Sequence, residues 1–158
     1  MPPDDSRRRH REPAEAMLVR RAETGDEPAI ARLWTLCDMA VPYNTPAWDT
    51  ALCRGATHSR LFVGEIEARV VASAMAGHDD HRGWIYYVAV NPAWQGAGLG
   101  RVIVAHAERW LKDSGVWKVS LMIRPSNRQA MGFYEHLGYR ETPRVVMAKT
   151  LAGDDDGD

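Results

Sequence analysis

A glycine-rich loop stands between a run typical of a β-strand and a run typical of a helix. Gly96, Gly98 and Gly100 occupy alternate positions in WQGAGLGR, after an apolar run that ends at Val90. Glycine lets the backbone approach a ligand closely, and N–H groups at a helix start point towards negative charge, aided by the helix dipole. This order of elements favours a phosphate site, although the same loop could simply connect strand to helix.

Two common phosphate-binding patterns do not fit this loop. The dinucleotide pattern G-x-G-x-x-G fails because Arg101 stands where the last glycine is required. The nucleoside-triphosphate loop requires Gly-Lys followed by Ser or Thr, whereas Gly100 is followed by Arg101 and Val102. The loop therefore predicts a phosphate site of another class.

The loop His78-Asp-Asp-His81 carries further reactive side chains. Imidazole and carboxylate groups bind metals, but consecutive loop residues rarely converge on one ion, and no further ligand motif accompanies them. We therefore expect a solvated loop and no metal site. Cys37 and Cys53 are too few for a disulfide scaffold or a cysteine zinc site, so we expect buried or idle thiols.

Composition and charge limit the possible class of protein. The chain has 158 residues, of which 45% are hydrophobic and 26% charged, with a net charge of −1, which suits one globular domain. This charge gives no reason to expect nucleic acid or membrane as a partner. No apolar run reaches the ~18 to 20 residues that a membrane-spanning helix needs, so we expect a cytoplasmic protein.

The two ends differ in composition from the middle. Residues 1–15 are charged, with a basic arginine cluster, and contain proline, and residues 152–158 are acidic. We expect both tails to be disordered, because they have little apolar surface to bury. Residues 16–151 are expected to form one folded domain. The arginine cluster from Arg7 to Arg11 could contact RNA or anionic lipid, but a short basic arm is usually solvated.

Hydrophobic spacing predicts the elements that would position these groups. The apolar residues of the expected first helix are Ile30, Leu33, Trp34 and Cys37, and those of the last are Ala130, Phe133, Tyr134 and Leu137. Ser126 and Gln129 match a capping box at the start of the last helix. The expected strands are 17–20, 61–66, 69–75, 84–90, 116–123 and 144–151, and the expected helices begin near residues 24, 45, 99 and 126.

The order of these elements indicates a mixed α/β domain. Residues 61–66 and 69–75 form a hairpin, since only a short polar turn separates them. The run 84–90 is apolar on both faces and is therefore expected at the centre of its sheet.

Two motifs together resemble a known family. Gln95-x-x-Gly98-x-Gly100 follows the strand residues Val88-Ala-Val90, and Asn127-x-x-Ala130-x-x-Phe133-Tyr134-x-x-Leu137-Gly138-Tyr139 lies further on. From about Met17 to Leu151 the chain resembles the GNAT superfamily of acetyl-CoA-dependent N-acetyltransferases, and LWTLCDMAVPYN and GHDDHRG look most like its small bacterial YpeA-like subgroup. The resemblance implies a mixed, mostly antiparallel sheet of about six to seven strands with about four helices.

The resemblance implies acetyl-CoA as the acetyl donor. The loop amides would bind its pyrophosphate, the strand before the loop would splay from its neighbour and pair with the pantetheine arm, and Asn127 would contact the same arm. Asn127 could instead be the helix cap. The residues assigned to cofactor binding are Val88, Ala89, Val90, Gln95, Gly96, Ala97, Gly98, Leu99, Gly100, Arg101, Asn127, Ala130 and Tyr134.

The implied reaction is direct attack of a neutral amine on the thioester. Tyr134 matches a tyrosine that protonates the departing thiolate, which suits a phenol of pKa ~10 beside a thiol of pKa ~8.5, although Tyr134 could be a core residue. A base, or water ordered by one, is also expected. The candidate bases are Glu65 and Tyr86 on strands and His78, Asp80 and His81 in the loop.

The acceptor is less well defined by the sequence. Met122 stands where the ribosomal-protein N-terminal acetyltransferases carry Glu, which speaks against peptide N-terminal acetylation. Trp34, Tyr43 and Trp48 could shape an amine pocket, although Trp34 also fits the apolar stripe of its helix. We expect a monomer or homodimer that acetylates a primary amine of a small molecule or a protein. The main alternative is a domain that binds acyl-CoA without turnover.

Overall fold

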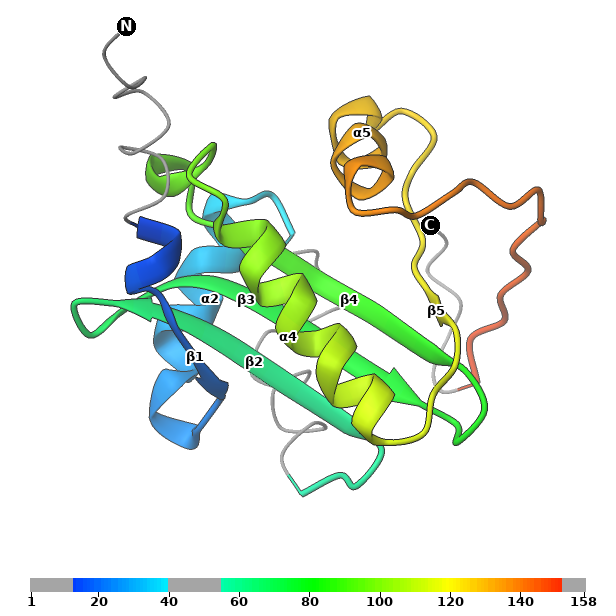
Figure 1. Ribbon diagram of the computed structural model, residues 1–158, viewed down its shortest axis with the longest axis horizontal. Coiled ribbons are helices and arrows are strands. Elements are labelled where there is room, and N and C mark those ends of the chain that lie inside the picture. Colours follow the sequence, from blue (N-terminus) through cyan, green and yellow to red (C-terminus); the bar gives the residue numbers. More distant parts are fainter. Residues whose placement is uncertain (1–12, 40–54, 152–158) are drawn as a thin grey trace, which may run out of the picture. The chain divides into compact units, whose positions relative to one another are not determined.

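The computed structural model describes residues 13–39 and 55–151, and the chain divides into two compact units, Met1–Met122 and Ile123–Asp158 (Figure 1). The arginine cluster, the helix expected to begin near residue 45 with Tyr43 and Trp48, Cys53 and the acidic C-terminal residues all lie outside the described residues. Residues 13–16 form one helical turn. Among the described helices, none is both long and apolar enough to cross a membrane.

The first unit is built on a five-stranded sheet in the order β1-β2-β3-β4-β5. Neighbouring strands are antiparallel from β1 to β4, and β5 joins β4 in parallel. The strands are β1 (Leu18–Arg21), β2 (Ser59–Ile66), β3 (Arg69–His78), β4 (Gly83–Val90) and β5 (Val119–Ser120). The mixed, mostly antiparallel sheet is confirmed, with fewer strands in the described residues than the expected number.

Strands β2 and β3 form the hairpin that the sequence predicts. Ile66 pairs with Arg69, and the two residues between them, Glu67 and Ala68, have φ values of 49° and 60°. Positive φ at both central positions is what a type I′ turn requires, and the twist of this turn matches that of antiparallel strands. The turn therefore joins β2 and β3 without disturbing their pairing.

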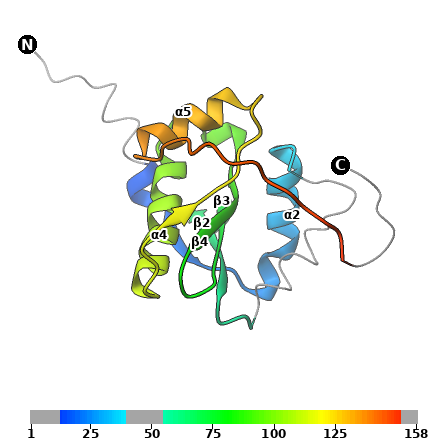
Figure 2. The same cartoon turned by 90° about the vertical axis from the view of Figure 1, so that its right-hand side faces the viewer.

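Helices cover both faces of the sheet. Figure 2 shows α2 (Glu27–Leu36) and α4 (Leu99–Asp113) on opposite sides of it. Successive residues of β2 face opposite sides, so Val63 joins the core under α2 while Phe62 contacts the rings of His106 and Trp110 on α4. The buried helix residues are Ile30, Leu33 and Trp34 on α2, and Leu99, Ile103, Val104, Ala107 and Leu111 on α4. The predicted apolar face of α2 is confirmed at Ile30, Leu33 and Trp34.

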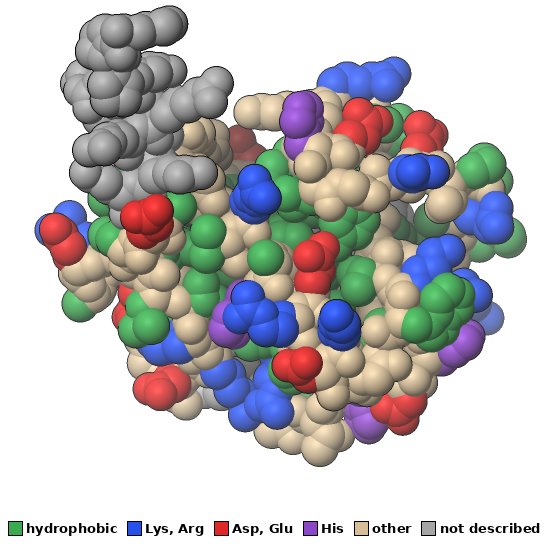
Figure 3. All heavy atoms as spheres, in the orientation of Figure 1, with side chains coloured by type: hydrophobic (Ala, Val, Ile, Leu, Met, Phe, Trp, Pro, Cys, Tyr) green, Lys and Arg blue, Asp and Glu red, His purple; other side chains and the backbone are tan. Residues whose placement is uncertain are grey.

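The outer face of α4 is polar. Figure 3 shows acidic and basic side chains interspersed over this face, as expected for a helix in contact with water. The helix ends with Lys112 in its last turn and Gly115 just beyond it at a φ of 88°. Glycine adopts this left-handed conformation without steric cost.

The second unit contains α5 (Arg128–His136) followed by Gly138, whose φ is 91°. Asn127 is the N-cap of α5, and its side-chain oxygen accepts the N–H of Ala130 at 3.1 Å. The predicted capping box of Ser126 and Gln129 is therefore wrong. The amide of Asn127 reaches the helix N–H groups directly and takes the place expected for Ser126.

Two predicted strands differ from the structure. The strand expected at 116–123 is reduced to β5, and residues 144–151 form no strand. Val145 and Met147 in that run are 89% and 91% exposed. Apolar and β-branched residues favour a strand only where they can pair and bury one face. The run 144–151 neither pairs with a strand nor buries one face, so its β-propensity alone does not make it a strand.

Candidate active site

Strand β4 has an open edge along most of its length. It pairs with β5 only at Gly83 and Trp84, so beyond Trp84 its only strand partner in the described part of the chain is β3. The expectation that β4 is central in the sheet is therefore wrong for its second half. An unpaired edge offers N–H and C=O groups to an extended ligand, as expected for Val88 to Val90.

A bulge at Tyr87 bends β4. Pairing with β3 shifts between Ser73↔Ala89 and Met75↔Tyr86, and Tyr87 has a φ of 49°. A bulge of this kind bends its strand and changes the direction of the groups around it. A residue other than glycine is strained at this φ, so neighbouring contacts must hold Tyr87 in place.

Buried side chains hold this bulge from the α2 side. The indole N–H of Trp34 donates to Ser73 Oγ at 2.9 Å, and the Ser73 hydroxyl donates to the Tyr87 carbonyl at 2.9 Å. The Trp34 ring also stacks on the Tyr87 ring, with centroids 4.2 Å apart. Trp34 is 1% exposed. It is therefore a core residue that braces β4, which leaves no room for the alternative of a pocket wall.

One carbonyl ties the end of β4 to α2 and to the glycine loop. The Val90 carbonyl accepts from the Cys37 thiol at 3.3 Å and from the side-chain amide of Gln95 at 3.1 Å. Burial raises the pKa of the Cys37 thiol, which keeps it protonated as a donor. A ligand that hydrogen-bonds the Val90 carbonyl must therefore displace one of these two donors.

The glycine loop follows a short 3₁₀ turn, η2 (Pro92–Trp94). Gly96 and Gly98 have φ values of 80° and 83°. A Cβ added to Gly96 would meet open space, and one added to Gly98 would lie 3.6 Å from the Cβ of Ala14, an ordinary contact. Glycine is required at both positions by the backbone conformation, and the space beside Gly96 remains open to a ligand.

The first turn of α4 has N–H groups without an acceptor in their own helix. Gly98 is the N-cap, no side chain of the described residues caps it, and the first intrahelical bond runs from the Val102 N–H to the Gly98 carbonyl at 3.3 Å. The N–H groups of Leu99, Gly100 and Arg101 precede this bond. Helix starts usually fill such positions with a side-chain oxygen, and an anion can replace it.

The second motif lies on α5, in the second unit. Because the side-chain oxygen of Asn127 caps the helix, its NH₂ group is the one that can donate to a ligand. The ring of Tyr134 packs edge-on against Phe133 and Tyr139, with centroids 4.9 Å and 5.5 Å away. Burial raises the pKa of Tyr134 to about 12, so its phenol keeps its proton throughout the physiological range.

Glu65 is part of a cluster of charges around Arg20. The Arg20 guanidinium donates to both carboxylate oxygens of Glu65, at 2.9 Å and 3.0 Å, and contacts the Asp26 carboxylate at 2.7 Å. These hydrogen bonds lower the pKa values of Glu65 and Asp26. A lower pKa makes a weaker base, and β3 separates Glu65 from β4. Both observations speak against Glu65 as the base.

The remaining base candidates lie at different places along β4. Tyr86 neighbours the bulge and is 39% exposed, and burial raises the pKa of its phenol. His78, Asp80 and His81 lie at the opposite end of this eight-residue strand from the glycine loop, roughly 25 Å away at ~3.4 Å per residue. Tyr86 is the candidate nearest the open edge.

Ser73 belongs to this site although it lies in the apolar run VVASAM and was not among the predicted residues. Its signal is weak, because one small polar residue in a buried strand is common. A buried hydroxyl must nevertheless find partners, and Ser73, 0% exposed, finds two at the bulge. The partner of Cys37 was likewise hidden, since Val90 is 53 residues away in the chain.

Comparisons with known proteins agree with this geometry. The model of the acetyltransferase (GNAT) family matches residues 27–139. An acetyltransferase from Pectobacterium atrosepticum is 32% identical over 138 residues, which cover 87% of this chain and 98% of that protein.

Solved structures show the same fold. The aminoglycoside N-acetyltransferase AAC(6′)-Iy in complex with CoA has a TM-score of 0.74 at 18% identity, covering 86% of this chain and 95% of that one. The ribosomal-protein-S18-alanine N-acetyltransferase from Escherichia coli has a TM-score of 0.68 at 26% identity, covering 80% of this chain and 79% of that one. With its open-edged β4, its uncapped glycine loop and these relatives, the chain belongs to the acetyltransferase (GNAT) family.

Proposed function

We propose that the protein transfers the acetyl group of acetyl-CoA, the donor of its family, to a primary amine of a small molecule or a protein. One observation carries the proposal: the open edge of β4 runs directly into the loop that ends at the uncapped start of α4. An extended arm can pair with a strand edge, and a pyrophosphate suits a helix start. Acetyl-CoA has both parts, joined end to end.

The backbone from Gln95 to Arg101 would hold the pyrophosphate. The positive φ values of Gly96 and Gly98 shape this loop, and the Gln95 amide fixes it to Val90. Exposed Arg101 adds positive charge in the first turn of α4. The pantetheine arm would pair with Val88 to Val90. The family resemblance also assigns Asn127 and Ala130 to cofactor binding.

The acetyl donor supplies an activated thioester. The amine nitrogen attacks its carbonyl carbon, the new C–N bond forms, and the C–S bond breaks. We assign Tyr134 to hydrogen-bond or protonate the departing thiolate, because its raised pKa keeps the phenol protonated while the thiolate forms. Tyr134 regains this proton from water.

The attacking amine must also lose a proton. Tyr86 is the candidate at the open edge, but its raised pKa makes its phenol a hydrogen-bond partner rather than a base. We propose that Tyr86 orients the amine or a water molecule, and that the proton leaves to water. The amine would therefore bind in its neutral form.

The first test is calorimetric titration of the protein with acetyl-CoA. Gly98→Glu places a negative charge at the proposed pyrophosphate site and should abolish binding. Gly115→Glu is a matched control, because Gly115 also has a positive φ, of 88°, but lies at the far end of α4. Equal affinity in the wild type and Gly98→Glu would overturn the proposed phosphate site.

The second test distinguishes an enzyme from a module that only binds acyl-CoA. Release of the CoA thiol is measured with a panel of primary amines, including polyamines, aminoglycosides and lysine peptides. Amine-dependent release that Gly98→Glu abolishes would support transfer. Tight binding of acetyl-CoA without release for any acceptor would favour the binding module.

Finer assignments rest on the same proposal. We propose residues 16–151 as the acetyltransferase domain, with residues 1–15 and 152–158 as tails. The stretches LWTLCDMAVPYN and GHDDHRG support placement in the YpeA-like subgroup. We also propose that the protein acts in the cytoplasm.

A further inference from the structure

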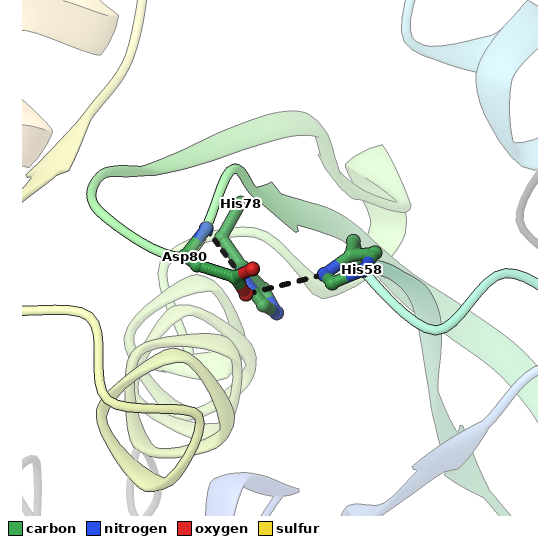
Figure 4. A group of neighbouring side chains, drawn as sticks. All are labelled: His58, His78 and Asp80. Carbon is green, nitrogen blue, oxygen red and sulfur yellow. Dashed lines mark hydrogen bonds and ion pairs between the residues drawn. The ribbon is translucent and has the colours of Figure 1, made fainter.

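Two histidines and an aspartate meet at the end of the sheet remote from the glycine loop. Figure 4 shows the side chains of His58, His78 and Asp80 pointing towards one another. His58 directly precedes β2, His78 ends β3, and Asp80 lies in the turn between β3 and β4. Their ligand atoms all lie within 4.8 Å of one another. The acetyl transfer proposed above uses none of them.

The spacing of the three groups suits a small cation. Asp80 Oδ1 lies 3.3 Å from the Nδ1 atom of His58 and 3.3 Å from that of His78. Tetrahedral coordination with metal–ligand bonds of about 2.0 to 2.1 Å places neighbouring ligand atoms about 3.3 to 3.4 Å apart. Two of the three distances between ligand atoms therefore already match such a site. Only the distance between the two imidazoles would have to shorten.

Two contacts of the His78 Nδ1 atom need opposite protonation states of that atom. Its Nδ1 is within reach of the Asp80 N–H, at 3.2 Å, and of the Asp80 carboxylate, at 3.3 Å. Accepting the N–H requires Nδ1 without a proton, whereas pairing with the carboxylate requires Nδ1 with one. A metal ion would bind the Nδ1 lone pair and the carboxylate together without a proton between them, and the Asp80 N–H would then give up its contact with Nδ1.

The backbone holds these residues in place. The N–H of His78 donates to the His58 carbonyl at 2.9 Å, so the two histidines are fixed side by side. The His78 side chain is only 5% exposed, with its ring 5.1 Å from that of His58 and 5.4 Å from that of Trp110. Asp80 has a φ of 67°, which turns it back towards the strands. Most of the ordering that a metal site needs is thus present before binding.

The charge of the turn also favours a cation. Asp79 precedes Asp80, and its side chain accepts the N–H groups of His81 and Arg82 at 3.0 Å and 2.7 Å. Asp79 thus adds a second carboxylate to the turn that carries Asp80. The guanidinium of Arg60 lies over the Trp110 ring, and that of Arg82, in the same turn, lies over the Trp117 ring.

We propose that His58, His78 and Asp80 bind one divalent transition-metal ion of the zinc type, with water completing the coordination. Two imidazoles and a carboxylate are typical ligands for such an ion, whereas Mg²⁺ and Ca²⁺ prefer oxygen alone. The site joins the start of β2 to the β3–β4 turn. Since it lies a strand's length from the glycine loop, its role is structural or regulatory, separate from acetyl transfer.

The test is titration of the full chain, without a histidine tag, with ZnCl₂ by calorimetry and with CoCl₂ by visible absorption. The wild type should bind one ion per chain, and Co²⁺ should give the intense bands of tetrahedral coordination. His58→Ala and Asp80→Asn should each weaken binding by at least about 10- to 100-fold. His58 and Asp80 are exposed, so these variants should fold normally.

His81→Ala is the matched control, because His81 lies in the same turn but contacts the Trp117 indole. It should bind Zn²⁺ like the wild type. Absence of saturable binding to the wild type would overturn the proposal, as would equal binding by His58→Ala and the wild type. Neither result bears on acetyl-CoA binding, so this site and the proposed function are tested separately.

Discussion

The hydroxyl of Ser73 donates to the backbone carbonyl of Tyr87 at 2.9 Å, which fixes the bulge in β4 from inside the core. The same hydroxyl accepts the indole N–H of Trp34 at 2.9 Å. The open edge of β4 is therefore anchored by one buried oxygen atom that satisfies both a helix side chain and a strand carbonyl. The shape of the proposed donor site depends on this oxygen.

Removing that oxygen should affect both stability and donor binding. Ser73→Ala leaves the Trp34 N–H and the Tyr87 carbonyl buried without this partner, which should cost about 1 to 3 kcal/mol in the free energy of unfolding. Relaxation of the bulge should also raise the KM for acetyl-CoA. Chemical denaturation and steady-state kinetics measure the two effects. Ser59→Ala, the same change elsewhere on the sheet, should alter neither.

A double-mutant cycle checks the mechanism of that effect. Trp34→Phe removes the indole donor, so Ser73→Ala should cost less in the Trp34→Phe background than in the wild type. Contacting residues of this kind typically show coupling free energies of about 0.5 to 3 kcal/mol. Strict additivity would mean that the Trp34–Ser73 hydrogen bond contributes nothing to stability.

Tyr134→Phe should lower kcat by roughly 100-fold or more while the affinity for acetyl-CoA stays nearly constant. The ring packs against Phe133 and Tyr139, and phenylalanine preserves this packing. Tyr139→Phe is the control for removal of a hydroxyl from the same aromatic cluster. An unchanged kcat in Tyr134→Phe would assign Tyr134 to packing alone.

The cluster around Arg20 should make stability depend on pH in the acid range. Hydrogen bonds from Arg20 hold the pKa values of Asp26 and Glu65 below their ordinary values of 3.8 and 4.5. The unfolded chain therefore binds more protons, so this contribution is present above about pH 4.5 and is lost as the pH falls. Glu65→Gln should show a shallower acid loss of stability in denaturation curves. Glu67→Gln, in the adjoining turn, should follow the wild type.

The rate of transfer should depend on the acceptor's own ionisation. If the amine binds as the neutral form and its proton leaves to water, kcat/KM rises with pH until the amine is deprotonated. Two acceptors whose amines differ in pKa should give profiles displaced by that difference. Profiles that coincide for both acceptors would reveal an ionising enzyme group, which would contradict the role proposed for Tyr86.

The elements that the sequence predicts well are those set by local patterns. The apolar stripe of α2 and the β2–β3 hairpin are confirmed, and Gly115 and Gly138 have the positive φ with which glycine ends a helix. Each depends on neighbours in the chain, through helical spacing or the conformational freedom of glycine. The order of the two motifs that indicated the family is local information of the same kind.

The features that the sequence does not predict depend on distant partners. The bulge at Tyr87 needs Ser73, and the cluster at Asp80 needs His58, which lies 22 positions earlier in the numbering. The run 144–151 shows the opposite case. Its residues favour a strand, but it pairs with no other strand in the described residues. Glu65 appeared suitable as a base until its partner Arg20 was visible.

The open edge of β4 also has a consequence for self-association. An unpaired strand edge is a template on which another chain can add a strand, and such edges promote aggregation. The groups proposed to pair with the donor arm are the ones that a second copy would use. Acetyl-CoA bound there would cover the edge. The donor would then protect the protein against aggregation as well as serve as a substrate. Without acetyl-CoA, the protein would be more prone to aggregate in concentrated solution.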